Sequence, residues 1–189
     1  MGVICMLCLY LTWLPDYLEH ERGLNVRETG WIVSIPYIFS TIGMLDGWFA
    51  DRLLAKEIAP LASLKWLMTI CLILAGAFTI PAVYTPSLVL AIIFISAAMC
   101  FLNMASGLAW TTVSISVPGR LVASHGSLMN CGGYLGGSGA PYVEWRIVDT
   151  TNSFVIALVV SAIVAMIAAI VSSILIRKPI KETDIIIKR

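Results

Sequence analysis

The sequence predicts an all-α, polytopic membrane protein with six transmembrane helices. Of its 189 residues, 59% are hydrophobic and only 12% are charged, and the mean hydropathy is +0.93. A soluble domain normally carries about 25% charged residues. The apolar residues form long continuous runs instead of an alternating pattern, which favours membrane-spanning helices over the strands of a barrel.

Six apolar runs approach or exceed the roughly 20 residues that a helix needs to cross a bilayer. They cover residues 2–18, 29–50, 61–82, 88–117, 121–143 and 154–176. The first run is short, and the fourth is longer than one straight span and ends at the turn signal Pro118-Gly119. We therefore expect one transmembrane unit over residues 1–178, followed by a tail over residues 179–189.

The basic residues of the loops are distributed unevenly between the two sides of the predicted bundle. Three lie on one side, namely Arg22, Arg27 and Arg146. Nine lie on the other side and in the tail, namely Arg52, Lys56, Lys65, Arg120, Arg177, Lys178, Lys181, Lys188 and Arg189. Cytoplasmic loops are enriched in Lys and Arg, so the more basic side and both termini are predicted to be cytoplasmic.

The remaining composition excludes several classes of function. The net charge of +1 provides no basic surface for nucleic acid. The five cysteines lie in apolar runs, which is typical of buried small hydrophobic residues, and we expect no metal and no cofactor. The charges of the first outer loop are typical of a solvated loop; they are Glu19, Glu21, Arg22, Arg27 and Glu28.

A charged motif, Gly47-x-x-x-Asp51-Arg52, ends the second apolar run. Glycine allows close contact between helices, and an aspartate at a helix end pairs with a base or caps a neighbouring helix. The motif resembles the gating loop of the major facilitator superfamily. In that family it joins the second and third helices and recurs, in weaker form, between the eighth and ninth.

Two longer stretches sharpen this resemblance. Residues Leu11 to Ile38 read LTWLPDYLEHERGLNVRETGWIVSIPYI, and residues Gly107 to Gly136 read GLAWTTVSISVPGRLVASHGSLMNCGGYLG. They resemble the seventh-to-eighth and tenth-to-eleventh helix regions of the anion:cation symporter branch, which comprises bacterial hexuronate, glucarate and galactonate carriers. The resemblance covers nearly the whole chain in order, and identifies its segments with helices 7–12 of a major facilitator fold.

The resemblance implies a secondary transporter in the bacterial inner membrane, moving a small organic anion by alternating access, coupled to protons. Such carriers hold the substrate at the midplane between two six-helix halves. In this branch the base that pairs with the anion and the acids that carry the proton lie in the N-terminal half. The expected partners are therefore the lipid bilayer, the anion, the proton and an N-terminal six-helix half that is missing from this sequence. The first segment is short, as if translation began inside the seventh helix.

The alternative to a transporter is a protein without independent function. In that case the chain is a truncated gene product that has no transport activity of its own or that needs a separate N-terminal half.

The fourth segment carries polar and aromatic residues on one helical face. They are spaced i, i+3, i+7 and i+11, and comprise Asn103, Ser106, Trp110 and Ser114. The resemblance matches Ser106 and Trp110 with positions that line the substrate cavity. The alternative is ordinary hydrogen bonding between helices.

The fifth segment has a similar face, formed by Asn130, Tyr134, Gly137 and Pro141. Asn130 matches a cavity-facing polar position of the family, where it could bind a substrate hydroxyl or carboxylate; the alternative is a structural asparagine. Two overlapping small-xxx-small patterns in the same segment favour close helix packing. They are Gly132-x-x-x-Gly136 and Gly133-x-x-x-Gly137.

Asp46 is an acid within the second apolar run, where related carriers usually have glycine. Burying an acid in hydrocarbon costs about 2.5–3.5 kcal/mol at the centre of a helix and less near its end. Three interpretations remain: a proton site, a structural acid that snorkels or pairs with Arg52, or a substitution tolerated in a chain no longer selected for transport.

An intramembrane enzyme is a weaker interpretation. Residues Gly136-Gly137-Ser138-Gly139 fit the G-x-S-G phrase of rhomboid serine proteases, whose serine needs a histidine base on a neighbouring helix. No histidine follows Ser138 in the sequence. We therefore expect a transporter and no enzyme.

Overall fold

The computed structural model describes residues 2–20, 22–45, 47, 48, 50, 52, 60–151 and 153–175. Its helices are α1 (Gly2–His20), α2 (Val26–Ser40), the 3-10 helix η1 (Thr41–Leu45), α4 (Pro60–Tyr84), α5 (Leu88–Ser116), the 3-10 helix η2 (Gly119–Leu121), α6 (Val122–Thr151) and α7 (Phe154–Leu175). Each of the six predicted segments contains a helix. Within these residues, three helices have the length and apolar composition of a membrane span: Leu61–Tyr84, Leu88–Ser116 and Phe154–Ile174. A count of six spans stays a prediction.

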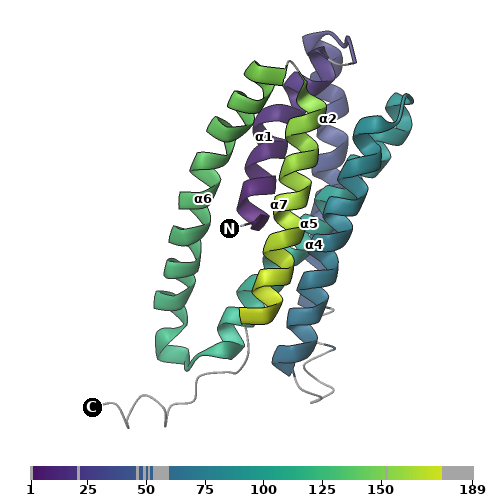
Figure 1. The fold of residues 1–189 in the computed structure, drawn as a ribbon. Coiled ribbons are helices and arrows are strands. Elements are labelled where there is room, and N and C mark those ends of the chain that lie inside the picture. Colours follow the sequence, from purple (N-terminus) through teal and green to yellow (C-terminus); the bar gives the residue numbers. More distant parts are fainter. Residues whose placement is uncertain are drawn as a thin grey trace.

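The helices lie side by side along one long axis (Figure 1). The α4 helix packs along α5 and α7, α2 packs along α5, and α1 packs along α6 and α7. In Figure 1 the α6 helix lies at one edge of the bundle, where it packs mainly on α1 and also touches α7 and α5. Large apolar side chains remain exposed on the outside of the bundle, including Ile70, Ile93, Ile163, Ile167 and Ile170. Such a surface is suited to lipid.

Some helix bounds differ from the predicted ones for local reasons. Asn25 and Glu28 form a capping box, in which the Asn25 side chain accepts from the Glu28 N–H, so α2 begins at Val26 and not at residue 29. Beyond Ser40 the chain tightens into η1, where the Thr41 N–H donates to the Ile38 carbonyl three residues back instead of four. The α6 helix continues to Thr151, well past the predicted end at residue 143.

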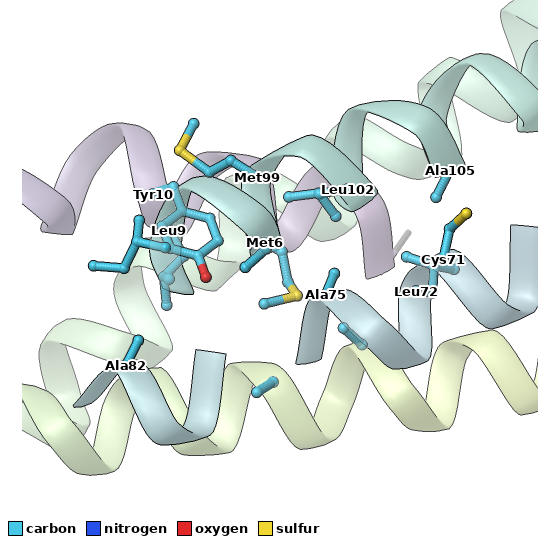
Figure 2. Close-up of a cluster of buried hydrophobic side chains, with 14 of the residues drawn as sticks. Met6, Leu9, Tyr10, Cys71, Leu72, Ala75, Ala82, Met99, Leu102 and Ala105 are labelled. Atoms are coloured by element: carbon cyan, nitrogen blue, oxygen red, sulfur yellow. The ribbon is translucent and has the colours of Figure 1, made fainter. Parts of the chain in front are cut away.

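The core lies where α1, α4 and α5 meet, and α7 closes it from the side of α4. Figure 2 shows Met6, Leu9 and Tyr10 of α1 facing Leu72, Ala75, Met99 and Leu102 of α4 and α5. The Tyr10 hydroxyl, fully buried, shares a 2.6 Å hydrogen bond with Thr79 Oγ1. Small residues bring α4 and α7 together, because a Cβ on Gly76 would lie 2.9 Å from Met166 Cγ and 3.2 Å from the Ala162 carbonyl oxygen.

Arg22 joins the loop after α1 to the loop between α4 and α5. Its Nη2 donates to the Thr85 carbonyl at 2.6 Å and its Nη1 to the Pro86 carbonyl at 3.1 Å. Its Nε and Nη2 also donate to the Tyr17 hydroxyl at 3.1 and 2.9 Å. The guanidinium therefore satisfies carbonyls beyond the last turn of α4. The interpretation of Arg22 as part of a solvated loop is wrong, since the side chain is half-buried and makes defined bonds.

The cysteines only partly follow the prediction of burial. Cys71 is buried, Cys8 and Cys100 are half-buried and Cys131 is exposed, and all four are free thiols. Cys131 lies on α6 and is exposed, so none of the described helices covers it.

One of the two overlapping glycine patterns forms a helix contact. A Cβ on Gly137 would lie 2.7 Å from Ile4 Cγ2 and 3.4 Å from Cys8 Sγ, whereas a Cβ on Gly132 would meet nothing within 4 Å. A Cβ on Gly133 would also collide with Ile4 Cδ1. Gly133 and Gly137 therefore form the surface of α6 on which α1 packs.

This contact gives the first testable prediction. Gly137→Ala is expected to destabilise the protein by about 1–3 kcal/mol, because Cγ2 of the β-branched Ile4 cannot swing away. Gly132→Ala is the matched control and should be neutral or slightly stabilising, since alanine favours helix. Thermal unfolding of the purified chain in detergent, followed by tryptophan fluorescence, measures both. Equal unfolding temperatures of the two variants would contradict the packing of α1 on this surface.

Candidate functional site

The α5 helix has two faces of different character. Leu102, Ala105, Leu108 and Thr112 are buried against the rest of the bundle. The predicted site residues lie on the other side: Asn103 and Ser106 are half-buried, Trp110 is 43% exposed and Ser114 is exposed. This face of α5 is thus less buried than the face that packs on the rest of the described helices, and its role in binding a substrate stays a prediction.

Two polar residues on this face are bonded locally. Asn103 Nδ2 donates to the Met99 carbonyl at 3.1 Å, and Ser114 Oγ donates to the Trp110 carbonyl at 3.0 Å. Ser106 makes no hydrogen bond with another described residue. Of these side chains, Ser106 is thus the one whose full hydrogen-bonding capacity remains for a ligand or another helix.

Asn103 lies where η1 comes closest to α5. A Cβ on Gly43 would collide with the Cys100 carbonyl oxygen and lie 3.0 Å from Asn103 Cβ and 3.1 Å from the Met104 nitrogen. Backbone therefore touches backbone at this point, which fixes the position of Asn103 relative to η1.

Trp110 connects the two predicted site faces. A Cβ on Gly126 of α6 would lie 2.6 Å from the Cζ3 atom of the Trp110 ring. The indole therefore lies flush against the α6 backbone near its first turns. Glycine at position 126 makes room for the ring, a role that the sequence pattern did not reveal.

On α6, Asn130 is half-buried and Tyr134 is 63% exposed. Neither side chain forms a hydrogen bond with any other residue in the described part of the chain. These two polar groups and Ser106 of α5 are consequently the candidate ligand contacts with unused hydrogen-bonding capacity.

The gating motif is only partly described. Gly47 is exposed, and the Arg52 guanidinium lies over the Trp48 ring with Cζ 3.6 Å from the ring centroid. Asp51 and Asp46 lie outside the described residues, so their predicted pairing with a base is untested.

The sequence analysis missed one acid, Glu144, because the fifth apolar run was taken to end at residue 143. The structure continues α6 through this position, and Glu144 is only 2% exposed. Its Oε1 accepts a 2.9 Å hydrogen bond from Ser161 Oγ of α7. Residues 144, 140, 137 and 133 lie at helical spacing, a signal that places Glu144 on the face of α6 that packs inward.

Comparison with known proteins identifies the family. The profile described as Major Facilitator Superfamily matches residues 1–141 of the chain. The probable L-galactonate transporter of Escherichia coli is 33% identical over 175 residues, which cover 92% of this chain and 39% of that protein. The probable galactarate/D-glucarate transporter GudP of Bacillus subtilis is 31% identical over 172 residues, which cover 91% of this chain and 37% of that protein.

A third relative, the D-galactonate transporter of Escherichia coli, is 32% identical over 143 residues, 75% of this chain and 33% of that protein. The chain thus spans less than two fifths of the length of these curated relatives. The predicted resemblance to the sugar-acid branch is confirmed, and the apolar helices agree with a multi-pass membrane protein. With a family profile that matches most of the chain, this protein belongs to the major facilitator superfamily.

Proposed function

We propose that this chain forms the C-terminal half of a secondary transporter that carries a small organic anion across the bacterial inner membrane. The observation that carries the proposal is the agreement between two independent features. The relatives that match the chain along most of its length are named transporters of galactonate, galactarate and glucarate. The polar faces of α5 and α6 leave Ser106, Asn130 and Tyr134 without a partner among the described residues.

These groups have the chemistry that a sugar acid requires. Serine and tyrosine hydroxyls and an asparagine amide donate and accept hydrogen bonds, which suits sugar hydroxyls. The Trp110 indole beside them offers a flat apolar surface to the carbon chain. An N-terminal six-helix half is then the partner that supplies the base for the carboxylate and the proton-carrying acids, and both termini of the chain are cytoplasmic. In alternating access the two halves rock against each other around the substrate site.

The test is complementation by a chimera. The N-terminal half of the probable L-galactonate transporter is fused to this chain and expressed in cells that lack their own sugar-acid carriers. We expect the chimera to accumulate labelled L-galactonate and to do so better at acid than at alkaline external pH. Each half expressed alone should take up none.

Several outcomes would contradict the proposal or a part of it. A chimera that reaches the membrane in normal amounts but transports none of the galactonates, galactarate or glucarate would favour the truncated, inactive gene product. Uptake by this chain alone would refute the need for a second half. Uptake that does not change with external pH would refute proton coupling.

In an active chimera, Asn130→Ala tests the candidate site. Loss of one hydrogen bond of about 0.7–1.4 kcal/mol should raise KM roughly 3- to 10-fold. Leu128→Ala is the matched control, because Leu128 is 72% exposed and lies on the opposite side of α6 from Asn130. An unchanged KM in Asn130→Ala would exclude this residue from the substrate site.

A further inference from the structure

Glu144 is the one acid of the described residues that is buried inside the bundle. It lies on α6 where α1 and α7 pack against that helix. Ser161 of α7 donates to its Oε1 at 2.9 Å. Its Oε2 is also buried and has no hydrogen-bond partner among the described residues.

A second unused polar group lies beside the carboxyl. The Trp13 indole of α1 is next to Glu144, yet its buried Nε1 has no partner of good hydrogen-bonding geometry in the described part of the chain. Trp13 is held from the other side by Phe154, the first residue of α7, with ring centroids 5.5 Å apart. The carboxyl therefore lies at a junction of three helices and faces two neutral donors.

Among the described residues, no cation of the helices packed on Glu144 is paired with its carboxyl. The α7 helix contains no ionisable residue. The one basic residue of α1 is His20, whose ring stacks on Phe154 and whose Nδ1 lies 3.0 Å from the Asp16 carbonyl. On α6 itself Arg146 is exposed and His125 is bonded to the Leu121 carbonyl, five turns away.

The other titratable groups among the described side chains of α1 form no hydrogen bond with Glu144. Tyr10 pairs with Thr79, and Tyr17 accepts from Arg22. Asp16, Glu19 and Cys8 form no hydrogen bond with Glu144. A buried carboxylate with one unpaired oxygen and no counter-charge is unfavourable, and such a group takes up a proton instead.

We propose that Glu144 is a proton-binding site built into the junction of α1, α6 and α7. A proton from solvent bonds to Oε2, the unpartnered oxygen, while Oε1 keeps its hydrogen bond from Ser161; release returns the proton to solvent. In the ionised state both oxygens attract donors, so Trp13 Nε1 is drawn to Oε2. The ligand is the proton itself, and its binding changes how α1 is held against α6.

The test is infrared spectroscopy of the purified chain in lipid vesicles, with difference spectra across steps of pH. We expect a carbonyl stretching band of a protonated carboxylic acid at neutral pH that is lost in Glu144→Gln. Asp149→Asn is the matched control, because Asp149 is an exposed acid on the same helix, and this variant should keep the band. Ser161→Ala leaves Glu144 in place and should shift the band by removing its hydrogen bond.

A neutral-pH band that survives Glu144→Gln, or the absence of any such band in the parent chain, would overturn the proposal. So would a band that Ser161→Ala leaves unmoved. The amide bands of the same spectra report whether each variant keeps its helices. The readout does not require transport, so failure of this inference and failure of the proposed function are separate results.

Discussion

Replacing Gly43 with alanine is expected to destabilise the protein by about 3 kcal/mol, at the upper end of the range for over-packing. The added Cβ would meet the Cys100 carbonyl oxygen and the Met104 nitrogen, which are backbone atoms of α5. A flexible side chain could turn aside, but a helical backbone cannot move without breaking its own hydrogen bonds. The helix α5 and η1 must therefore separate, and Asn103 moves with them.

Thermal unfolding in detergent measures this effect, at about 2–4 °C per kcal/mol for a chain of this length. Gly30→Ala is the matched control, because Gly30 lies in α2 with nothing within 4 Å of its Cβ position. That variant should be neutral or gain up to about 1 kcal/mol from helix propensity. A Gly43→Ala protein as stable as the Gly30→Ala protein would show that η1 does not touch α5 at this point.

Replacing Arg22 with alanine is expected to cost about 1.5–3 kcal/mol, the value of one well-formed hydrogen bond to a charged group. Arg22 makes several such bonds, to Thr85, Pro86 and Tyr17, but water can replace some of them at the end of the bundle. The same unfolding assay measures the loss. Limited proteolysis between α4 and α5 should become faster, because the Thr85 and Pro86 carbonyls are no longer held.

Two further variants separate charge from geometry. Arg22→Lys keeps the charge but loses the planar fork, so its stability should fall between those of the parent and Arg22→Ala. Arg27→Ala removes an exposed arginine of the same region and should change stability by less than about 0.5 kcal/mol. Equal losses in Arg22→Ala and Arg27→Ala would mean that net charge matters and the bonds to the α4–α5 loop do not.

The order and the approximate positions of the helices could be predicted because long apolar runs and turn signals are local properties. The ends were harder, since each depends on a specific cap or on the neighbouring helix. Asn25 and Glu28 extend α2 toward the N-terminus through a capping box, and α6 continues past Val143 to Thr151, with the Glu144 carboxyl accepting from Ser161 on α7. A run defined by hydropathy ends at an acidic residue. In the folded protein Glu144 stays within the helix, where Ser161 of α7 donates a hydrogen bond to its carboxyl.

The candidate site could be predicted only as a set of helical faces. The spacing of Ser106 and Trp110 places them on one face of α5, and in the structure Ser106 is half-buried and Trp110 is 43% exposed. Nothing in the spacing reveals that Trp110 packs on Gly126, or that Gly43 lies on Asn103, because these contacts join residues far apart in the sequence. The role of Asp46 stays a prediction, as that residue lies outside the described ones.

The bond between Arg22 and the Thr85 carbonyl also has a consequence for biosynthesis. The two residues are 63 positions apart. At about 5–20 residues per second, the ribosome needs about 3 to 13 s to deliver the second after the first. During that interval the α1–α2 loop must be held by its own capping box and by water. The loop after α1 therefore gains its last hydrogen bonds only when the loop between α4 and α5 has been made. In a nascent chain arrested before residue 85, the α1–α2 loop stays accessible to proteases or chaperones.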